Sequence, residues 1–284
     1  MRVVVVGATG VLGRWVVPLL VARGHDVRPV VRTTEAARRL AAEGLKAAEA
    51  DILDAGSLVT ALDGAEVVVN VATSIPRPGP NQDWQQNDRI RREGTANLIA
   101  ACGRSGTRKV VQQSIAFLVP STGADFVDEA SPVVTAARTE SAAEVEDRVA
   151  RSELDWTVLR GGAFYGPGTG RDETWRSLAR EGRLQVPGEG DDFISLIHVK
   201  DMAEATVAAT TSATGNVVLN IVDDEPVTYE TLFAHIAHIE DAPAPPHGGP
   251  PLLPSFRARN TRARAALGWR PHVATYRSGL APAG

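Results

Sequence analysis

A run of four valines near the start of the chain leads directly into a glycine-rich turn and then into a stretch with helical spacing. The run covers residues 3–6, the turn reads Gly7-Ala8-Thr9-Gly10-Val11-Leu12-Gly13, and the helical stretch covers residues 14–23. Glycine permits a sharp turn and a close approach of the backbone to a ligand, while the first amides of a helix have no partner inside the helix. Together they predict a site for the pyrophosphate of a dinucleotide, contacted by residues of the turn: Gly7, Thr9, Gly10, Val11, Leu12 and Gly13.

Further apolar runs alternate with amphipathic stretches up to residue 160. The runs, which have the composition of buried parallel strands, cover residues 27–31, 66–71, 109–114 and 156–160. The stretches between them, which carry apolar residues at three-and-four spacing, cover residues 34–43, 57–62, 89–104 and 139–152. Strands that alternate with helices predict an α/β fold built on a doubly wound parallel sheet.

The sequence pattern changes after Gly161, where loops rich in glycine and proline separate shorter segments. These segments cover residues 174–181, 193–197, 200–211, 217–222 and 228–239, and a proline-rich surface connection follows at residues 241–254. We therefore expect a dinucleotide-binding domain at residues 1–160 and a smaller substrate-binding lobe at residues 161–284, partly interleaved with the first.

Composition excludes several classes of partner. The net charge of −4 and the isoelectric point of about 5.9 give no general attraction to nucleic acid, and no apolar run has the length of a membrane span. The first strand leaves no room for a signal peptide, and the single Cys102 cannot form an intramolecular disulfide. No cluster has metal-ligand spacing. We expect a cytoplasmic protein that acts on a small molecule without a metal.

Three positions at predicted strand ends bear on the cofactor. Arg32 follows the second strand, where NAD-binding proteins usually carry an acid, so NADP(H) is favoured over NAD(H); the alternative is a solvated arginine in a turn. Asp51, next to Ile52, could accept from the adenine amino group or cap the helix that begins near Ala55. Ala72 is small enough to leave room for the nicotinamide ribose.

Several motifs resemble the extended, epimerase/dehydratase-like branch of the short-chain dehydrogenase/reductase superfamily. Besides the glycine-rich turn, they are Glu93-Gly94-Thr95-Ala96-Asn97-Leu98, Leu154-Asp155-Trp156-Thr157-Val158-Leu159-Arg160, Phe164-Tyr165-Gly166-Pro167-Gly168, His198-Val199-Lys200-Asp201 and Leu267-Gly268-Trp269-Arg270-Pro271. The resemblance covers nearly the whole chain. It implies a Rossmann domain, a nicotinamide cofactor and often a dimer built on two helices, here residues 89–104 and 139–152.

The chain departs from this family at the proton relay. Members carry Tyr-x-x-x-Lys on the helix after the fifth strand, with the lysine holding the ribose of the cofactor, and a serine or threonine at the end of that strand. Ser114 matches the serine, but the register given by Ser141 and Glu146 places Arg138 at the tyrosine position and Ala142 at the lysine position. The only tyrosines, at positions 165, 229 and 276, are not followed by lysine four residues later.

Other groups are candidates to replace the relay, each with a structural alternative. Tyr165 could reach a substrate or pack its own loop, and Arg138 could bind a substrate oxyanion or be solvated. His198 could act as an acid or base but more often joins strand to helix in this family. Glu140 and Glu144 could form a solvated helix face or supply a base.

The sequence predicts part of the wall of the substrate pocket. Residues 73–84 with Phe117, Phe164, Trp175 and Phe193 predict an apolar wall for a flat or apolar substrate. Four arginines could instead bind a phosphate-bearing substrate, although the last three have the spacing of one solvated helix face: Arg171, Arg176, Arg180 and Arg183.

The leading hypothesis is an NADP(H)-dependent oxidoreductase of atypical mechanism acting on a small carbonyl or alcohol, with Ser114, Tyr165 and Arg138 as candidate catalytic residues. The first alternative is a redox-neutral isomerase, epimerase, dehydratase or cyclase on the same fold. The second is an NADP-sensing protein without catalysis.

Overall fold

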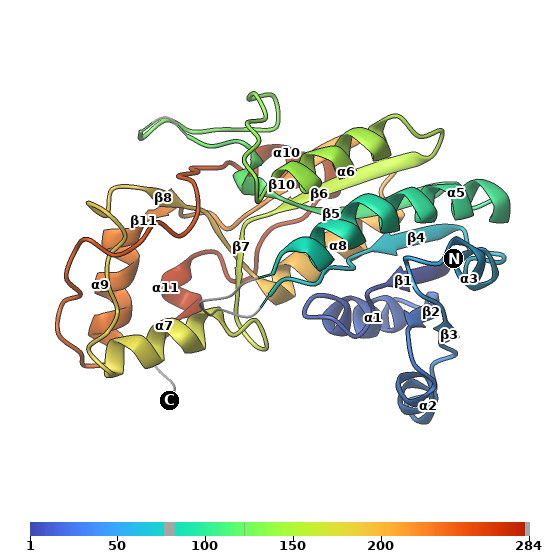
Figure 1. Cartoon of the computed structure of the whole chain (residues 1–284), viewed down its shortest axis with the longest axis horizontal. Helices are drawn as coiled ribbons and strands as arrows, with labels where there is room; N and C mark the ends of the chain where they lie inside the picture. Colours follow the sequence, from blue (N-terminus) through green and yellow to red (C-terminus); the bar gives the residue numbers. More distant parts are fainter. Residues whose placement is uncertain (77–82, 122, 282–284) are drawn as a thin grey trace. The chain divides into compact units, whose positions relative to one another are not determined.

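The structure is a computed structural model that describes residues 1–76, 83–121 and 123–281. Its main feature is a seven-stranded sheet with the strand order β10-β6-β5-β4-β1-β2-β3 (Figure 1). Starting from β1, the strands follow one another in chain order toward both edges of the sheet, which is the arrangement of a doubly wound fold. The predicted fold class is thereby confirmed.

The strands at the centre of this sheet are short apolar runs, because both of their faces are covered by helices. β1 (Arg2–Val6) pairs in parallel with β2 (Asp26–Val31) and β4 (Val67–Asn70), β4 pairs with β5 (Lys109–Ile115), and β2 pairs with β3 (Ala48–Glu49). The register aligns Val6 with both Val30 and Asn70, and Asn70 with Gln112. The carboxyl ends of β1, β2, β4 and β5 therefore lie along one edge.

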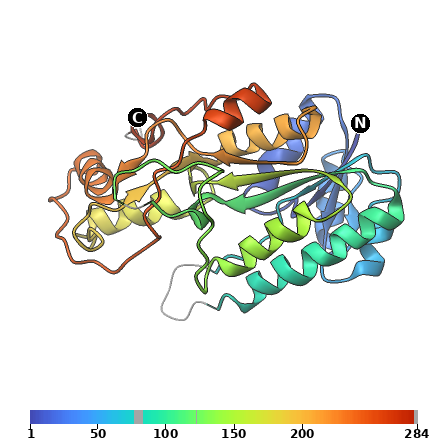
Figure 2. The same ribbon diagram turned by 90° about the horizontal axis from the view of Figure 1, so that it is seen from above.

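Helices α5 (Thr95–Ser105) and α6 (Glu140–Ala150) lie side by side on one face of the sheet, and α1 (Gly13–Ala22) lies on the other (Figure 2). The remaining helices before residue 95 are α2 (Thr34–Ala42), α3 (Ala55–Ala61) and α4 (Gln85–Arg89). Side chains such as Leu58, Leu98 and Val158 are fully buried in the core that these elements enclose.

Helix α3 begins at Ala55, as expected, and Asp54 caps it. The Asp54 carboxylate accepts from the amides of Gly56 and Ser57, whereas the Asp51 carboxylate accepts from the amide of Leu53. The alternative that Asp51 caps this helix is therefore wrong.

The helix expected at residues 89–104 is interrupted. α4 continues into the π-helical turn η1 (Ile90–Gly94), and α5 follows directly. A π-helical turn inserts an extra residue into the helical repeat and is frequent at functional sites. Helix α5 ends at Gly106, whose φ of 77° lies in the left-handed region that glycine tolerates.

The chain forms two compact units that alternate along the sequence. The first comprises Met1–Ser114, Thr135–Leu159 and Thr206–Val218, and the second comprises Ile115–Val134, Arg160–Ala205 and Leu219–Gly284. Strands β6 (Asp155–Gly161) and β10 (Val217–Ile221) both belong to the seven-stranded sheet. Residues 217–222, expected in the second lobe, thus contribute the edge strand of the main sheet.

The second unit contains two small sheets. β7 (Ala163–Tyr165) pairs in parallel with β9 (Leu196–His198), and β8 (Phe193–Ile194) pairs antiparallel with β11 (Val227–Thr228). The other elements after β5 are η2 (Ala116–Leu118), α7 (Arg171–Arg180), α8 (Val199–Thr211), α9 (Tyr229–Ile239), α10 (Thr261–Leu267) and α11 (Tyr276–Gly279).

The simpler expectation, one solvated face that carries Arg176, Arg180 and Arg183, is met in part, because Arg180 and Arg183 are exposed and Arg176 is half-buried. Arg176 and Arg180 both pair with the half-buried Glu240, each at 2.5 Å. Arg171 donates through Nε to the carbonyl of Phe164 at 2.9 Å, and Arg183, beyond the helix, pairs with Glu181. These guanidinium groups have partners within the second unit, which weakens the case for a phosphate site on this helix.

Candidate functional site

The glycine-rich turn connects β1 to α1, and its three glycines are required for different reasons. Gly7 has a φ of 86°, and a Cβ atom there would lie 2.7 Å from the amide nitrogen of Ala72. A Cβ atom at Gly13 would lie 2.7 Å from the carbonyl carbon of Ala8 and closer still to Gly7. Both positions are therefore explained by the packing of the turn against its own strands and helix.

Gly10 is different, because it is exposed and a Cβ atom there would meet a single described atom within contact distance, the Gly7 carbonyl oxygen at 3.2 Å. The backbone amides of Val11, Leu12 and Gly13 have no hydrogen-bond partner among the described residues. These unpaired amides lie at the start of the ten-residue helix α1, and Gly10 beside them has no side chain to exclude a ligand. This arrangement fits the pyrophosphate of a dinucleotide. Thr9 is exposed on the same turn.

The other predicted cofactor residues follow the strands next to β1. Arg32 comes directly after β2, is exposed, and has no hydrogen-bond or ion-pair partner among the residues that the structure describes. Asp51 is half-buried after β3. The side chain of Ile52 packs in the core, and its carbonyl accepts from Asn97, so Ile52 has little free surface for a ligand. Ala72 follows β4 beside Gly7.

Ser114 lies on β5 in the row of strand ends that holds the glycine-rich turn. Its side chain is buried, and its Oγ donates a hydrogen bond of 2.5 Å to Oε1 of Glu146, which is buried on α6. Ser114 also lines a cavity of about 10 Å³, which is about the room that one water molecule needs. The other lining residues are Ala72, Thr73, Arg91, Thr95, Gln112, Gln113, Ala142 and Val145.

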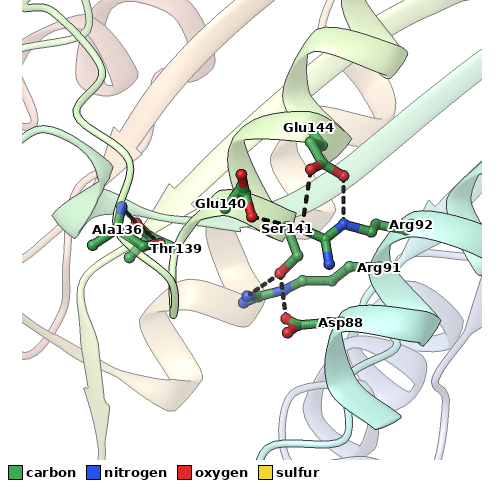
Figure 3. Close-up of polar contacts among 8 residues, drawn as sticks. All are labelled: Asp88, Arg91, Arg92, Ala136, Thr139, Glu140, Ser141 and Glu144. Atoms are coloured by element: carbon green, nitrogen blue, oxygen red, sulfur yellow. Dashed lines mark hydrogen bonds and ion pairs between the residues drawn. The ribbon is translucent and has the colours of Figure 1, made fainter. Parts of the chain in front are cut away.

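A second polar group, which includes Arg91 of the cavity wall, is drawn in Figure 3. Arg91, on η1, donates through Nη1 to Oγ of Ser141 at 3.3 Å, and Ser141 donates to Oδ1 of Asp88 at 2.6 Å. Arg91 and Ser141 are buried, and burial lowers the pKa of the Arg91 guanidinium while Asp88 opposes this shift. Arg91 lies on the wall of the cavity that Ser114 and Ala142 share.

The neighbouring Arg92 is half-buried and pairs with two carboxylates of α6 instead (Figure 3). Its guanidinium lies 2.5 Å from Glu144 and 3.1 Å from Glu140. The hydrogen bond from Arg92 lowers the pKa of Glu144, so this carboxylate is held in its charged form at the protein surface. This arrangement agrees with the surface alternative for both glutamates.

Arg138 precedes α6 and is exposed, with its guanidinium carbon 5.9 Å from the centroid of the Trp84 ring. It does not line the cavity at Ser114. Residues 77–82 of the predicted apolar wall lie outside the described residues. Within the second unit, Phe117 packs on Phe256 and Trp175 packs on Phe233.

Tyr165 is completely buried in the second unit. Its hydroxyl donates to the carbonyl of Thr275 at 3.5 Å, and burial raises its pKa. His198 packs against Tyr165 edge to face at 5.3 Å between ring centroids, and burial lowers its pKa, which favours the neutral imidazole. Both side chains have the surroundings of packing residues.

Two other kinds of site are absent from the described ranges. Residues 1–76, 83–121 and 123–281 contain no group of three or more metal-ligating side chains of the His, Cys, Asp and Glu types. In the same part of the chain, no helix combines the length and the apolar character that crossing a membrane requires.

Sequence reasoning missed the two charged residues of the site. Glu146 served only as a marker of register, and Arg91 was not singled out. The signal for Arg91 was its place on the face of the helix that also carries Thr95, Leu98 and Cys102, all buried. An arginine on a buried face needs an explanation, because arginine is rarely buried without a partner.

Comparisons with known proteins agree with this geometry. A family model described as NAD(P)H-binding matches residues 7–212. The 3-diazoavenalumate denitrifying reductase of a Streptomyces species is 40% identical over 307 residues, with 99% of each chain covered. A UDP-glucose 4-epimerase of Mycolicibacterium smegmatis is 29% identical, with 96% of this chain and 95% of the relative covered.

Solved structures show the same fold at lower identity. UDP-glucose 4-epimerase of Thermus thermophilus in complex with NAD has a TM-score of 0.81 at 23% identity, covering 99% of this chain and 97% of that chain. The dTDP-glucose 4,6-dehydratase DesIV of Streptomyces venezuelae with NAD bound has a TM-score of 0.84 at 20% identity, covering 99% and 95%. The chain therefore belongs to the NAD(P)H-binding family, as an enzyme with the fold of the extended short-chain dehydrogenase/reductases.

Proposed function

We propose that this enzyme is an NADP(H)-dependent reductase that delivers hydride to a small substrate next to Ser114. The observation that carries the proposal is the buried pair of Ser114 and Glu146, which lines a cavity in the same row of strand ends as the glycine-rich turn. The full-length relative named as a reductase supports the same reaction class.

The first substrate class is a small carbonyl compound, or the alcohol in the reverse direction. The bound dihydronicotinamide would supply hydride to carbon, and a proton must also reach the carbonyl oxygen. Among the residues on the cavity wall, Ser114 is the one linked to an ionisable carboxyl group that could exchange this proton, through its hydrogen bond to Glu146. Arg138 and Tyr165 have no assigned role in this proposal.

A second substrate class is a diazo compound, favoured by the absent relay together with the relative named for 3-diazoavenalumate. When hydride replaces the diazonium group of an aryl diazonium cation, a C–H bond forms, the C–N bond breaks and N₂ leaves with that bond's electron pair. The charges of the cation and the hydride balance, so this form needs no proton, whereas a neutral diazo compound would first take one proton on carbon. An enzyme that acts on the diazonium form does not need the tyrosine as a proton donor, so the absence of this tyrosine would not impair the reaction.

The test is an assay of purified enzyme with NADPH or NADH and separate panels of carbonyl, alcohol and diazo substrates, with cofactor oxidation and N₂ release measured in parallel. Cofactor oxidation with carbonyl compounds supports the first class. Oxidation matched by an equal amount of N₂ supports the second. Substrate conversion without net cofactor oxidation favours the redox-neutral alternative, and tight cofactor binding with no conversion in any panel favours the sensor.

A further inference from the structure

Arg91 is a buried cation with most of its hydrogen-bonding capacity unused. Its side chain is 9% exposed, and its one hydrogen bond to a described residue runs to the Ser141 hydroxyl. It forms no direct ion pair with a carboxylate of the described residues, although the Asp88 carboxylate, bound to the Ser141 hydroxyl, acts on it electrostatically. A guanidinium group has five N–H donors, so several remain free for an acceptor that arrives with a ligand. A buried charge without such a partner is unfavourable.

Arg91 lines a cavity that adjoins the glycine-rich turn. Ala72 links the two features, since it lines the cavity and its amide lies against Gly7. The wall also includes Ser114 at the end of β5. The volume of about 10 Å³ is too small for a substrate, but it has room for an oxygen atom such as that of a hydroxyl group.

Ala142 explains why an arginine can occupy this place. It lies on α6, at the position where the family resemblance implies a lysine that holds the ribose, and it lines the same cavity. Its methyl group leaves the space that a lysine side chain would fill. Arg91 enters the same space from η1, the turn next to α6.

We propose that the Arg91 guanidinium binds the hydroxyl oxygens of the ribose on the nicotinamide side of the cofactor, supplying from η1 the cation that Ala142 does not supply from α6. Ser141 and Asp88 act as positioning residues: Ser141 accepts from Arg91 and donates to Asp88, which fixes the direction of the guanidinium. The inference rests on the dinucleotide site of the proposed function, but not on hydride transfer.

The test compares two ligands by calorimetric titration. NADPH carries both riboses, whereas adenosine 2′,5′-bisphosphate carries only the adenosine half. Arg91→Met should weaken NADPH about 10- to 100-fold, the usual effect of losing a hydrogen bond to a charged group, and leave the bisphosphate within about 2-fold. Arg91→Lys should recover part of the loss. The matched control is Arg92→Gln, which removes the adjacent arginine and should leave both affinities unchanged.

Other outcomes overturn the inference. Equal weakening of both ligands by Arg91→Met would indicate general damage to the fold, and unchanged NADPH affinity would show that Arg91 does not contact the cofactor. If the enzyme prefers NAD(H), the same comparison is made with NADH and ADP. If the unaltered enzyme binds none of these ligands, the dinucleotide site itself is refuted. If Arg91→Met weakens NADPH more than the bisphosphate but the unaltered enzyme turns over no substrate, only the reductase proposal is refuted.

Discussion

The Ser114 hydroxyl donates its hydrogen bond, 2.5 Å long, to the Glu146 carboxylate, and both side chains are buried. A hydrogen bond of this length from a hydroxyl group to a carboxyl oxygen fixes the direction of the serine oxygen. The pair joins β5 to α6 at the place where the family relay would act.

Turnover should therefore depend on this pair. We expect Ser114→Ala to lower kcat about 10²-fold, since a hydrogen bond that strengthens in the transition state is lost, and Glu146→Gln to lower it in the same direction. Combining the two changes should cost little more than one alone, because they act through one contact. The measurement is steady-state kinetics with the substrate class found active.

Two variants control for general effects. Ser177→Ala removes a serine that also donates to a glutamate, at 2.8 Å, but on the exposed surface of α7. Tyr165→Phe removes a buried hydroxyl far from solvent. Neither should change kcat by more than about 2-fold. If Ser114→Ala has as little effect as these controls, Ser114 is not catalytic.

The glycines of the turn should separate binding from stability. Gly10→Val should lower the melting temperature modestly, because its Cβ atom would lie 3.2 Å from the Gly7 carbonyl oxygen, and should abolish NADPH binding, because its side chain occupies space open to the ligand. Gly13→Ala should destabilise the protein by about 1–3 kcal/mol, since its Cβ atom meets the backbone of the turn. Thermal denaturation and cofactor titration measure the two effects. If the folded Gly10→Val variant binds NADPH as tightly as the unaltered enzyme, the predicted pyrophosphate site at the glycine-rich turn is refuted.

Arg32 should determine the preference for NADPH. Because it is exposed and has no described partner, Arg32→Ala should weaken NADPH about 10-fold or more with little effect on NADH. Arg104→Ala, which removes an exposed arginine near the end of α5, is the control. Titration with both cofactors measures the ratio, and an unchanged ratio in Arg32→Ala would place the source of selectivity elsewhere.

Local patterns in the sequence predicted the main elements of the dinucleotide-binding part of the fold. The valine run of β1, the glycine-rich turn and the alternation of strands with helices follow from burial and periodicity, and the positions of Gly7, Gly10 and Ser114 follow from them. Pairings between distant elements could not be predicted in this way. That residues 217–221 join the main sheet as its edge strand depends on pairing that no local pattern encodes.

The relation between Arg91 and Ala142 was also hidden from the sequence, because about fifty residues separate them along the chain and a π-helical turn sets the direction of Arg91. It leads to a further prediction. Ala142→Lys should destabilise the protein, since a second cation enters a small cavity beside Arg91, by about 1–3 kcal/mol. In an Arg91→Ala background the same change should cost less. Equal costs in both backgrounds, measured by denaturant unfolding, would show that the two positions do not share the cavity.

The central claim, that the enzyme delivers hydride from its cofactor to a substrate without the tyrosine and lysine relay, is tested most directly by isotope transfer. The enzyme is incubated in ordinary water with NADPH that carries deuterium on the transferred position of the nicotinamide, and the product is examined by mass spectrometry. We predict one deuterium in each product molecule and one NADP⁺ formed for each product. Product without deuterium, formed while the NADPH concentration stays constant, would contradict the claim.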